Sequence, residues 1–279
     1  MTTKKNKILC NMDTTDFESF LKLENLAGNT IASYKYAVKE YFARYKVLNK
    51  NNLVAYKNFL IDNFSPKTVN LRIVGINKYL VYARKPRLRL KSIKEQQRSY
   101  LENVISNADY EFLKERLKME KIQTWYFAVR FLAATGARIS ELIHLKAEHI
   151  QVGYFDIYTK GGKVRRIYIP KQLCTEATVW LSEQSRSSGY VFMNHCGQRI
   201  STRGIAQQLK YYARKYGMNE KVVYPHSFRH KFAKNFLDKF NDISLLADLM
   251  GHDSIETTRI YLRRSSAEQQ DIVDKVVTW

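Results

Sequence analysis

A basic run that contains a proline, ARKPRLRLKSIKEQQR at residues 83–98, divides the chain into two parts. The run carries seven Lys and Arg side chains against one acid, and its proline lacks the backbone donor that would continue a helix. On both sides of it, apolar residues recur at the three- and four-residue steps of helices. We therefore expect a tail at 1–12, a helical domain at 13–84, an interdomain linker at 85–100 and a second domain at 101–279.

The first part predicts four helices. Thr15 or Asp16 can cap the first, Asn29 can cap the second, and Ser65 followed by Pro66 is typical of a helix start. The apolar residues that would share the inner faces are Phe17, Phe20, Leu21, Ile31, Tyr34, Val38, Tyr41, Leu53, Tyr56, Leu60, Val69, Ile73, Ile76 and Leu80. We expect residues 13–84 to form a compact four-helix domain.

The second part predicts helices and one hairpin. Asn107 can cap a helix, and the apolar stretch WYFAVRFLAATG predicts another that ends at Gly136. The stretch YFDIYTKGGKVRRIYIP predicts two strands joined by a turn at Gly161 and Gly162. From about Leu173 onward the spacing is again helical. The expected fold class is mainly α, with a small antiparallel β-sheet in the second domain.

The charge of the chain predicts a polyanionic partner. Lys and Arg number 47 against 26 Asp and Glu, a formal charge of +21, and residues 1–98 hold 20 of these bases but only 7 of the acids. Double-stranded DNA is the expected partner. A 45% hydrophobic content is ample for folded cores. We find no apolar run long enough for a signal peptide or a membrane span, so we expect no membrane contact and a cytoplasmic, nucleoid-associated location in a bacterium.

Four motifs then occur in a fixed order: TGARISEL at 135–142, TKGGK at 159–163, PHSFRHKFA at 225–233 and GHDSIETTRIY at 251–261. Each is weak by itself, but the ordered set closely resembles the active-site motifs of the tyrosine recombinase (phage integrase) family. The resemblance implies six catalytic residues, namely Arg138, Lys160, His226, Arg229, His252 and Tyr261. It also implies that Glu141 orients the cations.

The resemblance implies that Tyr261 attacks a DNA phosphate and forms a 3′-phosphotyrosyl bond. The forked guanidinium groups of two arginines would bind the negatively charged transition state. Lys160 would give a proton to the leaving oxygen, His226 would help to remove the tyrosine proton, and His252 would donate a hydrogen bond to the phosphate. The covalent bond conserves the energy of the diester, so we expect no cofactor. No carboxylate cluster or CxxC pair suggests a metal site.

The same resemblance implies that residues 13–84 are a core-DNA-binding domain of the SAM-like type. The family form that this chain resembles is the short, Xer-like one, which has no arm-binding domain. The basic run would lie along the DNA backbone through Arg84, Lys85, Arg87, Arg89 and Lys91. A solvated linker without DNA contacts is the alternative for this run.

The end of the chain predicts an assembly contact. An apolar stripe follows the candidate nucleophile, made of Ile272, Val273, Val276, Val277 and Trp279. In the family, a terminal helix of this kind docks on a neighbouring subunit, which implies a homo-tetramer, or a hetero-tetramer with a related recombinase, on paired sites. Packing of the helix on its own domain is the alternative.

The function predicted is site-specific recombination, for integration or excision of a mobile element. Two alternatives stay open: a type IB topoisomerase-like enzyme, which cuts DNA in the same way, and a DNA-binding regulator without catalysis. The set of six residues argues against the regulator.

Overall fold

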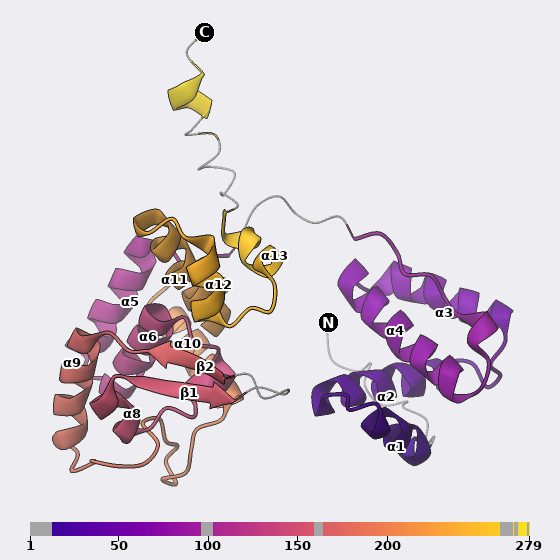
Figure 1. The fold of residues 1–279 in the computed structure, drawn as a ribbon, viewed down its shortest axis with the longest axis horizontal. Helices are drawn as coiled ribbons and strands as arrows, with labels where there is room; N and C mark the ends of the chain where they lie inside the picture. Colours follow the sequence, from indigo (N-terminus) through magenta and orange to yellow (C-terminus); the bar gives the residue numbers. More distant parts are fainter. Residues whose placement is uncertain (1–12, 96–102, 159–163, 263–269, 271–272, 278) are drawn as a thin grey trace. The chain divides into compact units, whose positions relative to one another are not determined.

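The computed structural model describes residues 13–95, 103–158, 164–262, 270, 273–277 and 279 (Figure 1). The chain divides into two compact units, residues 1–97 and 98–279, each with a hydrophobic core of its own. Both are mainly helical, and the described strands form one two-stranded sheet in the second unit. The predicted fold class is confirmed.

Four helices form the first unit. They are α1 (Thr15–Leu23), α2 (Gly28–Phe42), α3 (Lys50–Asn63) and α4 (Pro66–Tyr82). Their inner faces bury an aromatic core in which the rings of Tyr41 and Tyr56 meet edge to face, 5.3 Å apart. Helix α4 begins after Ser65 as predicted, whereas Ala27 rather than Asn29 precedes the first turn of α2.

Two asparagines of α4 hold the basic segment that follows this helix, which includes the short helix η1 (Pro86–Leu88). Asn77 bonds both the backbone N–H and the carbonyl of Leu90, each at 2.9 Å, and Asn70 does the same for Ile93 at 2.9 and 3.0 Å. Leu88, Leu90 and Ile93 pack on the helical core, while the basic side chains between them are exposed. The described part of the expected linker is therefore fixed to the first unit.

The second unit consists of helices around the hairpin. Its elements are α5 (Asn107–Met119), α6 (Gln123–Thr135), α7 (Ile139–Leu142), α8 (Ala147–Val152), β1 (Tyr154–Tyr158), β2 (Val164–Tyr168), α9 (Lys171–Ser182), α10 (Thr202–Lys215), α11 (Pro225–Lys239), α12 (Ile243–Met250), α13 (Ile255–Thr258) and η2 (Arg259–Leu262). The strands are antiparallel, with Tyr154 opposite Tyr168 and Tyr158 opposite Val164. The predicted turn at Gly161 and Gly162 lies outside the described residues.

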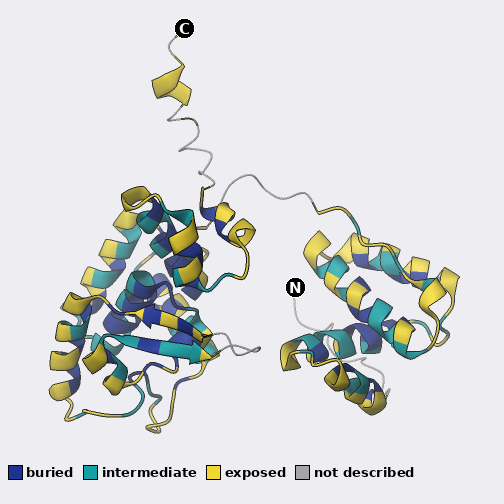
Figure 2. Ribbon diagram, in the orientation of Figure 1, coloured by how far each residue is buried: buried dark blue, intermediate teal, exposed yellow. Residues whose placement is uncertain are grey.

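The second unit has two separate apolar clusters. The larger joins α5, α6 and α8 to the strands, α9 and α10, and Figure 2 shows its residues in dark blue on the inner faces of these elements. The smaller holds α12 and η2 against the second half of α11, through Ala233, Leu237, Leu246, Met250 and Tyr261. The short helix η2, which carries Tyr261, thus packs, among the described residues, on α11 and α12 and not on the larger cluster. None of the described helices is both long and apolar enough to cross a membrane.

Candidate active site

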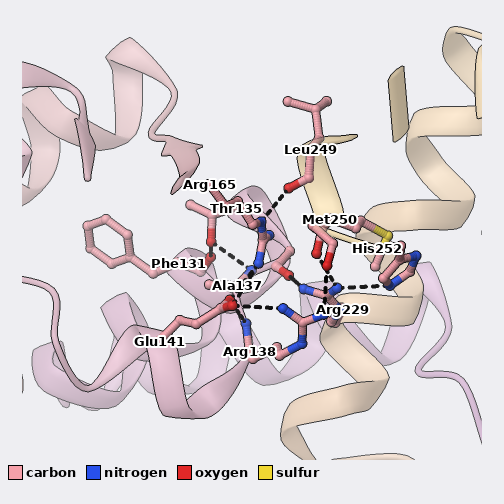
Figure 3. A network of polar contacts seen from close by, with 12 residues as sticks. Phe131, Thr135, Ala137, Arg138, Glu141, Arg165, Arg229, Leu249, Met250 and His252 are labelled. Atoms are coloured by element: carbon pink, nitrogen blue, oxygen red, sulfur yellow. Dashed lines mark hydrogen bonds and ion pairs between the residues drawn. The ribbon is translucent and has the colours of Figure 1, made fainter. Parts of the chain in front are cut away.

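Arg138 lies at a tight connection between two helices. Helix α6 ends at Gly136, which has a left-handed φ of +60°, and Arg138 precedes the first turn of α7. A Cβ atom at position 136 would lie 2.4 Å from the ring of Phe232, so both backbone and packing favour glycine. The Arg138 side chain reaches the end of α12, where Nη2 donates to the carbonyl of Gly251 at 3.1 Å (Figure 3). It remains 35% exposed and accessible to a ligand.

Glu141 is a buried carboxylate between two arginines. It accepts hydrogen bonds from Nη1 of Arg138 at 2.8 Å, from the Arg138 backbone N–H at 2.7 Å, and from Nη1 of Arg165 at 2.7 and 2.8 Å. Burial alone would raise the pKa of Glu141, but the charge of Arg165 and the bonds from Arg138 outweigh burial and lower it. Glu141 therefore stays ionised and fixes the direction of Arg138.

Arg229 comes from α11 and is almost completely buried. Its Nη1 donates to the carbonyl of Gly136 and its Nη2 to the carbonyl of Met250, both at 2.6 Å. Burial, with the charges of Arg138 and Arg165, lowers the pKa of Arg229 to about 10, so the guanidinium is still charged at neutral pH. A fixed, desolvated cation therefore lies at the centre of the site.

His226 lies in the first turn of α11, three residues before Arg229. Its side chain is exposed, unlike that of Arg229. Partial burial of the ring and the charges of Arg229 and Arg138 lower the pKa of His226. At neutral pH the imidazole is uncharged, which is the form that can accept a proton.

His252 follows the glycine that ends α12. Its Nε2 lies 3.0 Å from Nη2 of Arg229, and its Nδ1 lies 2.7 Å from Oγ1 of the buried Thr258. An arginine can only donate, so Nε2 is the acceptor and Nδ1 carries the proton. Burial and the charges of Arg229 and Arg138 lower the pKa of His252 to about 4. The ring is therefore neutral in this arrangement.

Tyr261 is buried in the smaller apolar cluster, in the short helix η2. Its ring is nearly parallel to that of His252, with centroids 6.2 Å apart, and is tilted against that of His230 at 5.4 Å. Burial raises the pKa of Tyr261, and the charge and hydrogen bonding of Arg229 offset this only in part. The phenol is thus protonated at rest and lies beside the most buried cation of the site.

The structure brings together four of the six predicted catalytic residues, Arg138, Arg229, His252 and Tyr261, with His226 on the turn before Arg229. Lys160 lies outside the described residues. The predicted DNA-binding residues Arg84, Lys85, Arg87, Arg89 and Lys91 belong to the first unit and are all exposed.

Three neighbours of these residues were not predicted from the sequence: Arg165, Thr258 and His230. Arg165 could have been found, because the alternation along Val164–Tyr168 places it on the same inward side as Ile167. Thr258 and His230 have no such signal, since their contacts with His252 and Tyr261 depend on how the segments pack.

The end of helix α12 connects the arginines. Its last carbonyl groups lack partners within the helix, and three successive ones each accept a hydrogen bond from a different arginine. Arg165 bonds to Leu249 at 2.9 Å, Arg229 to Met250 at 2.6 Å and Arg138 to Gly251 at 3.1 Å. Beside them lies a groove of about 1030 Å³, lined by residues that include Arg138, Arg165, Tyr168, Leu245, Gly251 and His252.

The model of the phage integrase family matches residues 103–268. The chain belongs to this family. The resemblance carried by the four motifs is thereby confirmed. Tyrosine recombinase XerA of Pyrococcus furiosus is 29% identical to this phage integrase family member over 271 residues, which cover 93% of this chain and 92% of XerA.

Two solved structures share the fold of this integrase-family chain. The XerH site-specific recombinase, in a post-cleavage complex with a palindromic difH substrate, matches with a TM-score of 0.70 at 19% identity, covering 94% of this chain and 84% of that one. The Tn1549 transposon integrase, in complex with transposon right end DNA, matches with a TM-score of 0.68 at 15% identity, covering 96% of this chain and 100% of that one.

The arrangement suits chemistry on an anion. Arg138 and Arg229 present charged donors from two elements, and Glu141 balances only part of their charge. Around Arg229 lie the phenol of Tyr261, a second guanidinium group and the neutral imidazole of His252. In the family's chemistry such groups stabilise a five-coordinate phosphorus and move the protons.

Proposed function

We propose that this chain is a site-specific tyrosine recombinase that cuts and rejoins DNA through Tyr261. The phenol oxygen attacks the phosphorus of the scissile diester, the bond to the 5′ oxygen breaks, and a 3′-phosphotyrosyl bond forms. A second 5′ hydroxyl reverses the step and joins the strands. The observation that carries the proposal is the position of the phenol beside Arg229, the same guanidinium that contacts the ring of His252.

The two arginines would bind the non-bridging oxygens of the phosphate. Hydrogen bonds to backbone carbonyls and to Glu141 already hold both guanidinium groups, so little rearrangement is needed when charge develops. Losing one such prearranged donor typically costs about 10²–10³ in rate. Arg138 is the more exposed of the two and would make the first contact.

Proton transfers would involve three further side chains. His226, neutral and exposed, would accept the proton of Tyr261, and Lys160 would give a proton to the leaving 5′ oxygen. His252 can donate to the phosphate through Nε2 only after that atom gains a proton, because it accepts from Arg229 at rest. The negative charge of a bound phosphate favours this protonation, since an adjacent anion raises a histidine pKa.

The basic run would bind the DNA backbone. Arg84, Lys85, Arg87, Arg89 and Lys91 are exposed, and from Arg87 to Lys91 the cations alternate with leucines that anchor the segment on the first unit. The result is a stripe of cations on a fixed support, which loses less conformational freedom on binding than a free linker would. The first unit would thus act as the core-DNA-binding domain.

We further propose assembly on paired sites as a tetramer, through the end of the chain. The described residues Val273, Val276, Val277 and Trp279 are 45–91% exposed, so an apolar surface is left for a neighbour to cover. We expect the enzyme to act on DNA in the bacterial cytoplasm, at the nucleoid. Integration or excision of a mobile element is the expected task, and the structural similarity to the Tn1549 transposon integrase supports it.

The nucleophile is tested by Tyr261→Phe, with Tyr211→Phe as the matched control on an exposed tyrosine of α10 in the same unit. A nicked suicide substrate traps the covalent adduct, which denaturing gels detect. We expect the parent and the control to form the adduct, and Tyr261→Phe to bind DNA equally well but form none. An adduct in Tyr261→Phe would place the nucleophile elsewhere.

A truncation after Ser265 separates the recombinase from a topoisomerase. It keeps Tyr261, so it should still cut the suicide substrate, but it should not hold two duplexes together in native gels as the full chain does. Circular dichroism verifies that the truncated chain is folded. A full chain that relaxes any supercoiled plasmid efficiently and never pairs two sites would instead be a topoisomerase.

A further inference from the structure

Arg165 is a buried arginine that the proposed reaction does not use. It lies on β2, where Val164, Arg166 and Tyr168 are exposed and Arg165 and Ile167 are buried. A buried guanidinium is costly unless charge and hydrogen bonds compensate for the lost water. The contacts of Arg165 therefore indicate what this strand position does.

The Arg165 side chain joins three elements. Nη1 donates to both carboxylate oxygens of Glu141, at 2.8 and 2.7 Å, which connects β2 to α7. Nε donates to the carbonyl of Leu249 at 2.9 Å, which connects β2 to the end of α12 (Figure 3). Strand β2 also follows directly on the segment 159–163, which contains Lys160.

Arg165 is not placed to touch DNA itself. Its side chain is 6% exposed, and its Nη2 is buried without a hydrogen-bond partner among the described residues. Its influence must pass through its partners. Glu141 holds Arg138 by two hydrogen bonds, and Leu249 lies three residues before His252.

The turn after α12 closes directly on this side chain. Gly251 has a φ of +60°, and a Cβ atom added there would lie 2.3 Å from Cδ of Arg165. The path of the backbone into His252 and the position of the Arg165 side chain therefore determine each other. The exposed neighbour Arg166 has no hydrogen bond to the end of α12 among the described contacts; it pairs instead with Asp156 on the hairpin.

We propose that Arg165 is a positioning residue that sets Arg138, through Glu141, and the His252 turn, through Leu249. The inference rests on the proposed recombinase function. It adds a residue that acts on the rate of strand cleavage without contacting the DNA. It also gives the buried charge of Glu141 a second purpose besides holding Arg138.

The test compares Arg165→Met and Arg165→Lys with Arg116→Met, the same change at an exposed arginine of α5 that pairs with Glu120 and does not line the groove. Adduct formation is followed on a nicked suicide substrate at saturating DNA, and DNA affinity is measured separately. We expect Arg165→Met to lower the cleavage rate by about 10²-fold, the typical effect of moving catalytic groups by about 1 Å, with affinity nearly unchanged. Arg165→Lys should recover only part of the rate, because one ammonium cannot replace the fork. Arg116→Met should cleave like the parent.

A double variant shows whether Arg165 acts through Glu141. Glu141→Gln and Arg165→Met should each slow cleavage, and the double variant should be slowed by less than the product of the two fold-changes, because both variants break the Arg165–Glu141 link. The double variant also removes both buried charges, so it should fold even where Arg165→Met alone does not. Thermal melts verify folding, and cleavage is measured well below each midpoint.

Each result has a distinct meaning. The positioning role is overturned if Arg165→Met cleaves at the parent rate, or if the fold-changes of the two single variants multiply in the double variant. In both cases the parent remains an active recombinase. A loss of affinity equal to the loss of rate would make Arg165 a DNA-binding residue instead. A parent that forms no adduct would refute the proposed function as well.

Discussion

Replacing Gly251 by alanine should damage the site far more than the same change at another helix end. Gly251 ends α12 with a φ of +60°. In this left-handed region an alanine costs roughly 1–2 kcal/mol. The added Cβ would also lie 2.3 Å from Cδ and 3.0 Å from Nε of Arg165. Such distances are shorter than van der Waals contact, so the Arg165 side chain must move.

The cost of this movement can be estimated from the bonds of Arg165. The side chain is buried and donates to Glu141 and to Leu249, so a shift of its Cδ breaks or lengthens these hydrogen bonds. Hydrogen bonds to charged groups contribute about 1.5–3 kcal/mol each. If one of these bonds is lost in full, the backbone strain of 1–2 kcal/mol brings the expected loss of unfolding free energy in Gly251→Ala to about 2.5–5 kcal/mol. Strand cleavage should fall about 10²-fold, because Arg138 and His252 lose their fixed positions.

Gly153→Ala is the matched control. Gly153 ends α8 with a φ of +82°, and no atom lies within 4 Å of the place where its Cβ would be. It should lose only the 1–2 kcal/mol of backbone strain and cleave like the parent. Urea unfolding and a single-turnover cleavage assay measure both quantities. Equal losses of stability in the two variants, with unchanged cleavage in Gly251→Ala, would refute the reasoning.

Three further outcomes follow from the described contacts. Ser227→Ala should lower the unfolding free energy by about 1–3 kcal/mol, because it leaves the buried N–H of Ile105 without its 2.7 Å acceptor. Burial and nearby cations lower the pKa of both His230 and His252 to about 4. The free energy of unfolding, measured in urea, should therefore fall by on the order of 1 kcal/mol per pH unit as the pH drops from about 6.5 toward 4. The fall should be less steep in His230→Phe. Charge reversal at Arg84, Arg87 and Arg89 should weaken binding to all DNA sequences and flatten its salt dependence; an unchanged salt slope would contradict the DNA-backbone role.

Much of the fold follows from local sequence signals. The steps of three and four residues in the first unit determine which side chains are buried, and the apolar stretch before Gly136 predicts the helix that ends there. The basic run is a part of the fold whose position the sequence does not predict. Its charge and proline predict a linker, but its fixed position depends on Asn70 and Asn77, whose amides bond the backbone of a segment that follows their own helix. Sequence spacing contains no trace of such pairing.

The candidate site divides in the same way. The motifs name Arg138, Arg229, His252 and Tyr261, because each has a chemically distinctive side chain at a recognisable spacing. They do not show the proton on Nδ1 of His252, which depends on Thr258 and Arg229 lying on opposite sides of one ring. Nor do they show that the end of α12 gathers three arginines. The first depends on contacts across 6 and 23 residues, and the second on contacts across 21, 84 and 113 residues.

The resting site also constrains the order of the chemical events. Burial and the nearby cations lower the pKa of His252 to about 4, and the hydroxyl of Tyr261 lies beside Arg229 but keeps a raised pKa because it is buried. A bound phosphate diester brings a negative charge, which raises the pKa of both groups. This helps the imidazole of His252 to gain the proton it needs as a donor, but it makes the phenol harder to ionise. The tyrosine should therefore lose its proton to a base during the attack on phosphorus rather than before it, which is the step that an exposed neutral His226 can assist.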